Sequence, residues 1–467
     1  MTPYDLVCHH YELPFDLYPF QVADVNELAP LGQSGAYLEP GLGKTAVSTC
    51  CALYKRVVAQ VEKVLVIMPP MLVPQWARWI AKIKSRSGQP LTVTAYQGTP
   101  AARKKLSLDA DFVLMGIQIF KKDYERVTEE LASHSVHVIL DEAHCIKDIG
   151  TDNYKLYRDF VSNRTHQLLT GTPLNKPLDA YAYIKLISPR IYRSKGQFEQ
   201  LHIAELDFFG NAKSFKNLDL LASNLTVGAV RHTKDDVLNL PPCTIQPIAY
   251  ELDVKHKKLY DKLANEQMLR LDDGNKIDAT QCTALFHNLQ QIICQWDYFA
   301  QDPKLVSQAY RLIEETLEEL GSKKLVVFAN YRRTNQALVD RFKCPGVWGE
   351  VTAKQKQTAL STFIEDDSCR MIALNAVSAG IGVDGLQDVC SDVLYVESPI
   401  SLSHWTQSMS RIDRQGQTKP VTIRIGTAIG TIQEYLIQAL TDKEDLVNPL
   451  QGSKSLLRAA IYGGNPP

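Results

Sequence analysis

The chain has 467 residues, of which 45% are hydrophobic and 22% are charged, a composition typical of an ordinary globular protein with two to three domains. Its formal net charge of −1 excludes an overall basic signature, so contact with nucleic acid would need a local groove. The sequence has no apolar run near the ~18 residues of a membrane span, no secretory signal pattern at its start, and ten cysteines without metal-ligand spacing. We therefore expect a cytoplasmic protein with reduced thiols and no membrane contact.

The first feature in chain order is a short apolar run, Gly35–Leu38, followed by a glycine-containing turn and a helical pattern over Lys44–Tyr54. This order predicts a phosphate-binding loop, because glycines and a helix N-terminus present backbone N–H groups to phosphate oxygens. Lys44 would reach the terminal phosphates of a nucleotide, and the Thr45 hydroxyl would bind Mg²⁺. The full pattern has a further glycine where this chain has Leu38, so a simple glycine turn after a strand is the alternative.

Strand-like and helix-like runs then alternate in two blocks, which predicts an α/β fold with two lobes, each built on a parallel sheet covered on both faces. The first block has strands at Lys63–Met68, Leu91–Tyr96, Asp111–Met115, Val136–Leu140 and His166–Leu169, and helices at Val73–Lys84, Ile119–Ala132 and Asn153–Val161. The second has strands at Lys324–Phe328, Gly346–Val351, Arg370–Leu374, Asp392–Glu397 and Val421–Ile425, and helices at Arg333–Phe342, Ala353–Ile364 and Thr431–Leu440. The stretch Ile187–Gly321 is predicted to be mostly helical, with a boundary at the turn cluster Leu240–Pro242.

Two carboxylates, Asp141 and Glu142, follow directly after the apolar run Val136–Leu140. In an open α/β sheet the carboxyl ends of the strands are where ligands bind. Asp141 would hold Mg²⁺, and Glu142 would orient and deprotonate an attacking water. The alternative is an acidic pair that stabilises a helix N-terminus.

In the second block, Gln407, Arg411 and Arg414 stand at steps of four and three, which predicts that they share one face of a helix. A guanidinium that reaches a transferring phosphate from another lobe is an arginine finger, worth roughly 10³–10⁵ in rate in other systems. Surface arginines on a solvated helix are the alternative.

Eight motifs in this order resemble those of the Swi/Snf-type ATPases of the superfamily-two helicase class, in a compact single-motor form. They are Leu17–Gln21, Pro40–Thr45, Val66–Pro69 with Trp76, Asp141–His144, Leu168–Leu174, Val230–Lys234 with Leu240–Pro242, Leu289–Cys294, and Gln407 with Ser410–Val421. The family's loop also lacks the early glycine. The chain departs from the family at Gly385, where an apolar residue is usual.

The resemblance implies two RecA-like lobes with Swi/Snf-type helical insertions between them. The expected domains are an ATP-binding lobe at 1–225 with an insertion near 187–225, a helical linker at 226–303 and a C-terminal lobe at 304–467. It also implies that the cofactors ATP and Mg²⁺ are bound by residues of both lobes, with Arg414 as the finger and Arg411 as a second phosphate contact. The implied nucleotide contacts are Gln21 (reading adenine), Pro40, Gly41, Leu42, Gly43, Lys44, Thr45, Asp141, Gly382, Asp384, Arg411 and Arg414. Coupling between the nucleotide and the partner is implied for Thr170, Gly171, Thr172 and Gln407.

The family binds double-stranded DNA across both lobes, mainly through phosphates, which position the protein without reading sequence. By resemblance, the candidate DNA contacts are Gln75, Gly98, Thr99, Gln118, Arg332, Arg333 and Ser378. Trp76 and Trp79 stand three residues apart in an amphipathic pattern and are predicted to pack in the core.

The function expected from these motifs is an ATP-dependent translocase that moves along duplex DNA and displaces or remodels bound proteins. A strand-separating helicase, a motor subunit of a repair or restriction assembly and a non-enzymatic scaffold are the alternatives. A scaffold would have lost one of Lys44, Asp141, Glu142, Arg411 or Arg414, and all five are present. We expect a monomeric motor that protein partners direct to its target.

Overall fold

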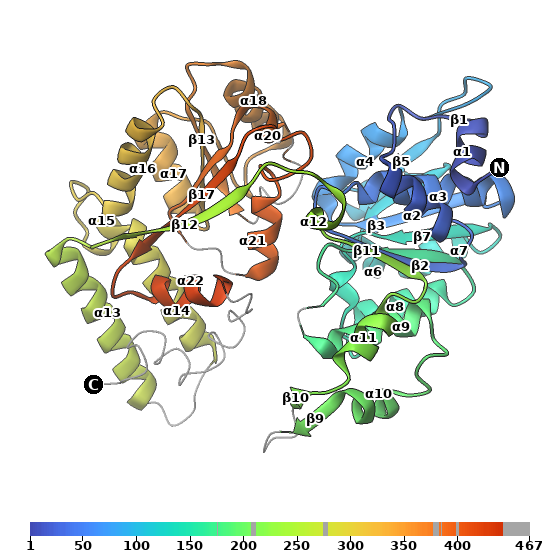
Figure 1. Ribbon diagram of the computed structural model, residues 1–467, viewed down its shortest axis with the longest axis horizontal. Helices are drawn as coiled ribbons and strands as arrows, with labels where there is room; N and C mark the ends of the chain where they lie inside the picture. Colours follow the sequence, from blue (N-terminus) through green and yellow to red (C-terminus); the bar gives the residue numbers. More distant parts are fainter. Residues whose placement is uncertain are drawn as a thin grey trace. The chain divides into compact units, whose positions relative to one another are not determined.

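The computed structural model describes residues 1–174, 176–206, 212–273, 279–376, 383, 385–397 and 401–441 (Figure 1). Backbone contacts divide the chain into two units, Met1–Asn239 and Leu240–Pro467. The second unit thus begins at the turn cluster that was predicted as a boundary. The finer limits at 225/226 and 303/304 stay predictions. None of the described helices is long and apolar enough to cross a membrane.

The first unit alternates strands with helices over most of its length, as Figure 1 shows. Its strands are β1 (Tyr11–Glu12), β2 (Gln33–Leu38), β3 (Lys63–Met68), β4 (Lys84–Ser85), β5 (Val93–Ala95), β6 (Phe112–Gly116), β7 (Val136–Leu140), β8 (Thr165–Leu169), β9 (Ile203–Leu206), β10 (Ala212–Phe215) and β11 (Ala229–His232). Its α-helices are α1 (Pro3–His10), α2 (Pro19–Leu28), α3 (Lys44–Val58), α4 (Val73–Ile80), α5 (Pro100–Arg103), α6 (Ile117–Lys122), α7 (Tyr124–Glu130), α8 (Asp152–Val161), α9 (Ala180–Ile187), α10 (Lys195–His202), α11 (Leu218–Leu225) and α12 (Lys234–Val237). Short 3₁₀ helices are η1 (Pro70–Leu72), η2 (Ala143–Ile146) and η3 (Pro177–Asp179).

Seven of the described strands of this unit form one sheet in the order β11-β2-β8-β7-β3-β6-β5, and every pairing in it is parallel. The other four form two antiparallel pairs, β1 with β4 and β9 with β10. Neighbouring residues of one strand belong to different apolar clusters: Val64 and Val66 lie in one and Leu65 and Ile67 in the other. Both faces are therefore buried, which is why these strands read as continuous apolar runs. Helices α1 to α4 cover one face, and α6 to α9 with α11 cover the other.

The second unit has the same layered construction (Figure 1). Its strands are β12 (Cys243–Tyr250), β13 (Leu325–Ala329), β14 (Gly346–Val347), β15 (Met371–Asn375), β16 (Asp392–Tyr395) and β17 (Val421–Ala428). Its helices are α13 (Val254–Asp273), α14 (Ala279–Cys294), α15 (Trp296–Phe299), α16 (Gln308–Glu319), α17 (Arg332–Phe342), α18 (Ala353–Glu365), α20 (Leu386–Val389), α21 (Leu402–Met409) and α22 (Ile432–Thr441).

The described strands of the second unit make a six-stranded parallel sheet in the order β12-β17-β16-β13-β15-β14. The predicted fold class, two parallel-sheet α/β lobes, is confirmed. Helices α13 and α14, which lie within the predicted helical linker at 226–303, pack with α22 in a separate apolar cluster.

The stretch Ile187–Gly321 is mostly helical, as predicted, and also contains four strands, β9 to β12. Of these, β11 and β12 are edge strands that pair with β2 and β17. Two predictions about helices of the first unit were wrong. The helix predicted at Ile119–Ala132 breaks at Asp123, whose side chain pairs with Arg103. The helix that starts at Val73 ends at Ile80 instead of Lys84.

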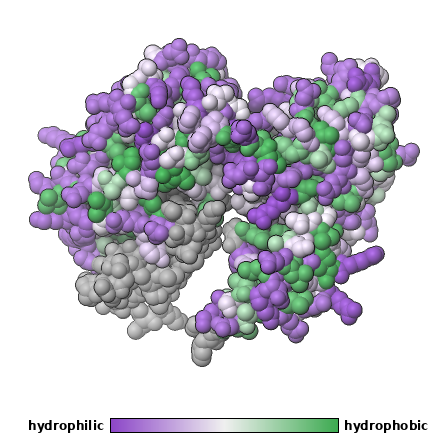
Figure 2. Space-filling view, in the orientation of Figure 1, coloured by the Kyte–Doolittle hydropathy of each residue, from purple (hydrophilic) through white to green (hydrophobic). Residues whose placement is uncertain are grey.

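Hydrophilic side chains cover most of the face seen in Figure 2, and apolar ones gather on the first unit over the segment from α9 to α11. Leu206, Leu218, Leu220 and Val227 are exposed in this segment. These are four of the eight large apolar side chains that are exposed among the described residues of the first unit.

Candidate nucleotide site

The predicted phosphate-binding loop lies between β2 and the N-terminus of α3. Gly41 and Gly43 have φ angles of 96° and 79°, left-handed values that glycine adopts without the strain of a side chain. Helix α3 is 15 residues long and begins at Lys44, so its free N–H groups and dipole face the loop. The Lys44 ammonium donates to the Leu38 carbonyl at 2.9 Å, which holds its head group over the loop.

Gln21, predicted to read adenine, is buried against this loop. Its Oε1 accepts from the backbone N–H of Tyr18 at 2.9 Å, and its Nε2 donates to the Leu42 carbonyl at 3.0 Å. A Cβ atom on Gly43 would lie 2.2 Å from Nε2. The side chain therefore fixes the path of the loop, and its contact with adenine stays a prediction.

The acidic pair follows β7, at the same sheet edge as the loop. Asp141 is 6% exposed, and burial raises the pKa of its carboxyl above the usual range; the Glu142 carboxylate adds to this shift. The Lys44 ammonium and a hydrogen bond from the Trp76 side chain lower the pKa of Asp141 again. The lysine of the loop and the carboxylate of β7 thus act on each other electrostatically, as the predicted site requires.

Glu142 has a left-handed backbone, with φ 53° and ψ 53°, and is the residue before the 3₁₀ helix η2. Such a conformation costs a non-glycine residue about 1–3 kcal/mol and persists where surrounding structure imposes it, often at functional sites. Its Oε2 lies 3.2 Å from His144 Nδ1. The alternative is an acidic pair that stabilises a helix N-terminus. Only a four-residue 3₁₀ helix follows Glu142, so such stabilisation would be small.

Strands β2, β8 and β7 are adjacent in the sheet, so the loop, the coupling residues and the acidic pair emerge side by side at one edge. Thr170, directly after β8, is fully buried, and its Oγ1 accepts from the Thr172 N–H at 3.2 Å. A Cβ atom on Gly171 would lie 2.8 Å from Pro40 Cδ. The predicted coupling segment therefore touches the nucleotide loop, although its coupling role stays a prediction.

We expect Gly171→Ala to displace Pro40 and with it the nucleotide loop. Overpacking of this kind costs about 1–3 kcal/mol, so the KM for ATP should rise about tenfold. Gly32→Ala is the control, because a Cβ atom at Gly32, just before β2, would have no neighbour within 4 Å. An unchanged KM in Gly171→Ala, measured beside the control, would contradict this role of the contact.

The family signature Val230–Lys234 lies beside the nucleotide loop. Its strand β11 pairs with β2, with His232 in register with Leu38. The Lys234 N–H donates to Glu39 Oε2 at 2.9 Å, and His232 Nε2 lies 2.8 Å from Oδ1 of the buried Asp24, on α2. The segment Val230–Lys234 thus links α2, which carries Gln21, and β2, which precedes the nucleotide loop, to the chain that continues into the second unit.

The prediction that Gln407, Arg411 and Arg414 share a helical face was wrong. Helix α21 carries Gln407 but ends at Met409. The Ser408 and Ser410 hydroxyls donate back to carbonyls of the preceding turn, an interaction that competes with helix continuation.

Arg411 and Arg414 lie in the turns after α21 and are partly buried. These turns are held by the buried Gln417, whose Nε2 donates to the Cys390 carbonyl at 3.0 Å and whose Oε1 accepts from the backbone N–H groups of Thr418 and Lys419. Arg411 Nη1 lies 3.4 Å from the Val383 carbonyl, which it donates to. A turn held by its own side-chain bonds can present both arginines without a helix.

The DNA candidates follow the carboxyl ends of strands in both sheets. Gln75 lies on α4 after β3, Gly98 and Thr99 follow β5, and Gln118 lies on α6 after β6. In the second unit, Arg332 and Arg333 begin α17 after β13 and are exposed. Gly382, Asp384 and Ser378 lie outside the described residues. Gly385, where the chain departs from the family pattern, has a φ of 88°, a left-handed value that glycine adopts without strain.

Comparison with known proteins places the chain in a family. The model of the SNF2-related domain matches residues 37–298, and the chain belongs to this family. The matched range runs from the strand of the nucleotide loop, through the acidic pair and the signature strand β11, into the helices of the second unit.

Curated relatives include an uncharacterized ATP-dependent helicase of Mycoplasma genitalium, 25% identical over 88% of this chain and 39% of its own length. The ATPase ISW1 of the ISWI chromatin-remodeling complex of Saccharomyces cerevisiae is 24% identical over 91% of this chain and 40% of its own length. The chain thus spans about two fifths of these relatives. Among solved structures, the SWI2/SNF2 ATPase core of Sulfolobus solfataricus in complex with dsDNA matches with a TM-score of 0.44 at 21% identity, covering 97% of this chain and 98% of that one.

Sequence reasoning missed the Asp24–His232 pair, the contact of Gly171 with Pro40 and the buried Glu397. Asp24 stands one helical turn after Gln21, which was a usable signal. Glu397 closes the apolar run that begins at Asp392, so the reasoning that singled out Asp141 would also have found it.

Proposed function

We propose that the chain is an ATP-dependent translocase of the Swi/Snf type, which hydrolyses ATP to move along double-stranded DNA and to displace or remodel bound proteins. One observation carries the proposal: a phosphate-type loop, an acidic pair and a glycine that touches the loop emerge from three adjacent parallel strands. This edge is where nucleotides bind in α/β sheets, and membership of the SNF2-related family supports the same activity.

In this proposal the loop binds the phosphates of ATP through backbone N–H groups and the N-terminus of α3. The Lys44 ammonium exchanges its bond with the Leu38 carbonyl for the terminal phosphates. Glu142 orients the attacking water and accepts its proton. Because the surrounding structure fixes the left-handed backbone of Glu142, its carboxylate is already in place before the reaction begins.

The residues also fit a divalent cation, because a buried carboxylate with a raised pKa beside a second carboxylate gains from a nearby positive charge. Thr45 and Asp141 would hold Mg²⁺, which would neutralise phosphate charge. Lys44 supplies part of this compensation from the chain itself.

We further propose that Arg411 and Arg414 of the second unit contact the same nucleotide, with Arg414 as the finger. Loss of the terminal phosphate would remove charge-assisted contacts to these arginines and to Lys44. If each unit holds its own stretch of DNA backbone, this cycle of contacts would step the protein along the duplex. Thr170 to Thr172 would relay the change, since Gly171 touches the loop.

Duplex DNA should stimulate the ATPase, and the stimulation should weaken with salt. Binding through phosphates releases counterions, so the half-saturating DNA concentration should rise about tenfold or more between 50 and 200 mM salt. The test is ATP turnover titrated with duplex, single-stranded, forked and RNA substrates at several salt concentrations. A salt-insensitive ATPase that ignores DNA would contradict the proposal.

A strand-separating helicase is the second candidate, favoured by the name of the Mycoplasma relative. A forked duplex discriminates between the two: ATP-dependent release of a strand would replace translocation by unwinding as the proposed activity.

We also propose that the motor works as a monomer in the cytoplasm, or the host-cell cytoplasm if its source is viral, with protein partners for targeting. A role inside a repair or restriction assembly agrees with this.

A further inference from the structure

Glu397 is a buried carboxylate that the proposed ATPase mechanism does not use. It follows β16 at the carboxyl edge of the second sheet and has no solvent exposure. Burial raises the pKa of Glu397 to about 7. A carboxyl group this deep in a protein is costly unless nearby groups hydrogen bond to it, so its partners indicate its role.

Three hydrogen bonds join Glu397 to the start of α17. Its Oε2 accepts from the backbone N–H groups of Asn330 at 2.7 Å and Tyr331 at 3.0 Å, and its Oε1 accepts from Thr334 Oγ1 at 2.5 Å. Tyr331, the N-cap residue of α17, makes no side-chain capping bond. Glu397 therefore supplies, from the end of a strand distant in sequence, the acceptor oxygens that the N-terminus of α17 needs.

The surroundings of Glu397 hold this bond set in one arrangement. Gln295 Nε2 donates to Thr334 Oγ1 at 2.9 Å, so the threonine hydroxyl hydrogen is directed to the carboxylate. The titratable groups that face Glu397 are Cys294 on α14, Tyr250 on β12, Tyr310 on α16 and Tyr331 before α17. Burial raises the pKa of each, so all four stay neutral near pH 7.

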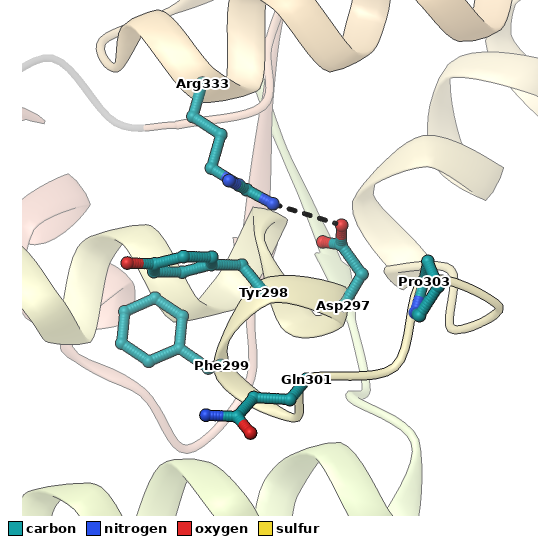
Figure 3. A pocket seen from close by; sticks show the side chains of 6 residues that line it. All are labelled: Asp297, Tyr298, Phe299, Gln301, Pro303 and Arg333. Carbon is teal, nitrogen blue, oxygen red and sulfur yellow. Dashed lines mark ion pairs between the residues drawn. The ribbon is translucent and has the colours of Figure 1, made fainter.

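The first turn of α17 carries the two arginines predicted to contact DNA. Figure 3 shows the Arg333 guanidinium above the Tyr298 ring, 4.1 Å from its centroid, with one nitrogen directed at Asp297 at 3.7 Å. Arg332 Nη1 lies 2.5 Å from Glu350 Oε2. Both arginines remain exposed, and their partners lie outside α17: Tyr298 and Asp297 on α15, and Glu350 in the turn after β14.

We propose that Glu397 is a positioning residue for the nucleic-acid contact of the second unit: it fixes the first turn of α17 so that Arg332 and Arg333 present their charges to DNA phosphates. This inference rests on the proposed function. Without the carboxylate, the N–H groups of Asn330 and Tyr331 lose their acceptor and the turn is free to fray.

The test compares wild type, Glu397→Ala and Glu397→Gln in the full chain, by basal ATPase and by the concentration of a duplex oligonucleotide that half-saturates the stimulated ATPase. We expect Glu397→Ala to raise that concentration about tenfold and to leave basal turnover unchanged. Glu397→Gln should stay within about threefold of wild type, because its amide oxygen can accept both backbone bonds.

If Glu397→Ala does not fold, Thr334→Val replaces it. This change removes the bond to Oε1 and the acceptor of Gln295 Nε2, keeps both backbone bonds to Oε2, and should raise the half-saturating concentration about threefold. A folded Glu397→Ala or Thr334→Val with wild-type DNA response overturns the inference alone. A wild-type protein that neither binds duplex DNA nor is stimulated by it overturns the proposed function together with the inference.

The pH dependence of melting gives a readout of the buried acid itself. When the pKa of a carboxyl group is higher in the folded than in the unfolded protein, the folding stability falls as the pH rises from the unfolded-state pKa to the folded-state pKa. For Glu397 the folded-state pKa is about 7. The melting temperature of Glu397→Gln relative to wild type should therefore increase between about pH 4.5 and pH 7. A pH-independent difference would mean that the carboxylate is not held as described.

Discussion

Glu142→Gln should reduce ATP turnover about 10²–10⁴-fold, the usual contribution of a general base, and leave the affinity for ATP nearly unchanged. Glutamine keeps the length and the Cβ atom of glutamate, so the left-handed backbone and the fit of η2 are preserved. Only the ability to accept a proton from water is lost. Single-turnover hydrolysis and equilibrium binding of a fluorescent ATP analogue, measured on the same sample, separate the two effects.

Glu129→Gln is the matched control, since Glu129 is an exposed glutamate on α7 of the same unit. It should hydrolyse ATP like wild type. Wild-type turnover in Glu142→Gln would remove Glu142 from the mechanism and leave Asp141 as the nearest carboxylate for the role of base. Loss of ATP binding would instead assign Glu142 to holding the nucleotide or its cation.

Arg414→Ala should reduce the turnover number by about 10³-fold, at the lower end of the range for arginine fingers. The reason is that a guanidinium stabilises charge that develops on the transferring phosphate and adds little to binding of the ground state. The KM for ATP should therefore change far less than the turnover number. Steady-state kinetics over a range of ATP concentrations, with saturating duplex DNA, measure both quantities.

Arg411→Ala and Arg311→Ala complete this comparison. Arg411 is proposed as a second phosphate contact, so its loss should raise the KM more than Arg414→Ala does. Arg311 is an exposed arginine on α16 of the same unit, and its replacement should leave both the turnover number and the KM unchanged. Equal and small effects of Arg411→Ala and Arg414→Ala would show that both are surface arginines, the alternative left open by the sequence.

The sequence predicted the two sheets well because their strands are buried on both faces. In a compact fold, a short apolar run such as Lys63–Met68 is best buried as a central strand of a parallel sheet, and its bounds agree with β3. Edge strands lack this signal. The exposed pattern of Cys243–Tyr250 reads as irregular chain, and only its pairing with β17 makes it a strand.

The nucleotide site was predictable in its parts, because the chemistry depends on contiguous residues such as Gly41 to Thr45. The arginine turns were not, since spacing alone cannot show that serine hydroxyls end α21 at Met409. Contacts between distant segments were also out of reach. The fit of Gly171 against Pro40 depends on which strands are neighbours in the sheet, and the hydrophobic periodicity of each segment does not determine strand order.

The pairing of β11 with β2 has a practical consequence for work on fragments. Residues 229–232 lie beyond the predicted end of the first lobe, yet they complete the sheet next to the strand that carries the nucleotide loop. A fragment that stops at residue 225 would leave β2 as an open sheet edge, with backbone groups free to pair with another molecule. An isolated first unit therefore needs to extend to Asn239, where the contacts that define it end.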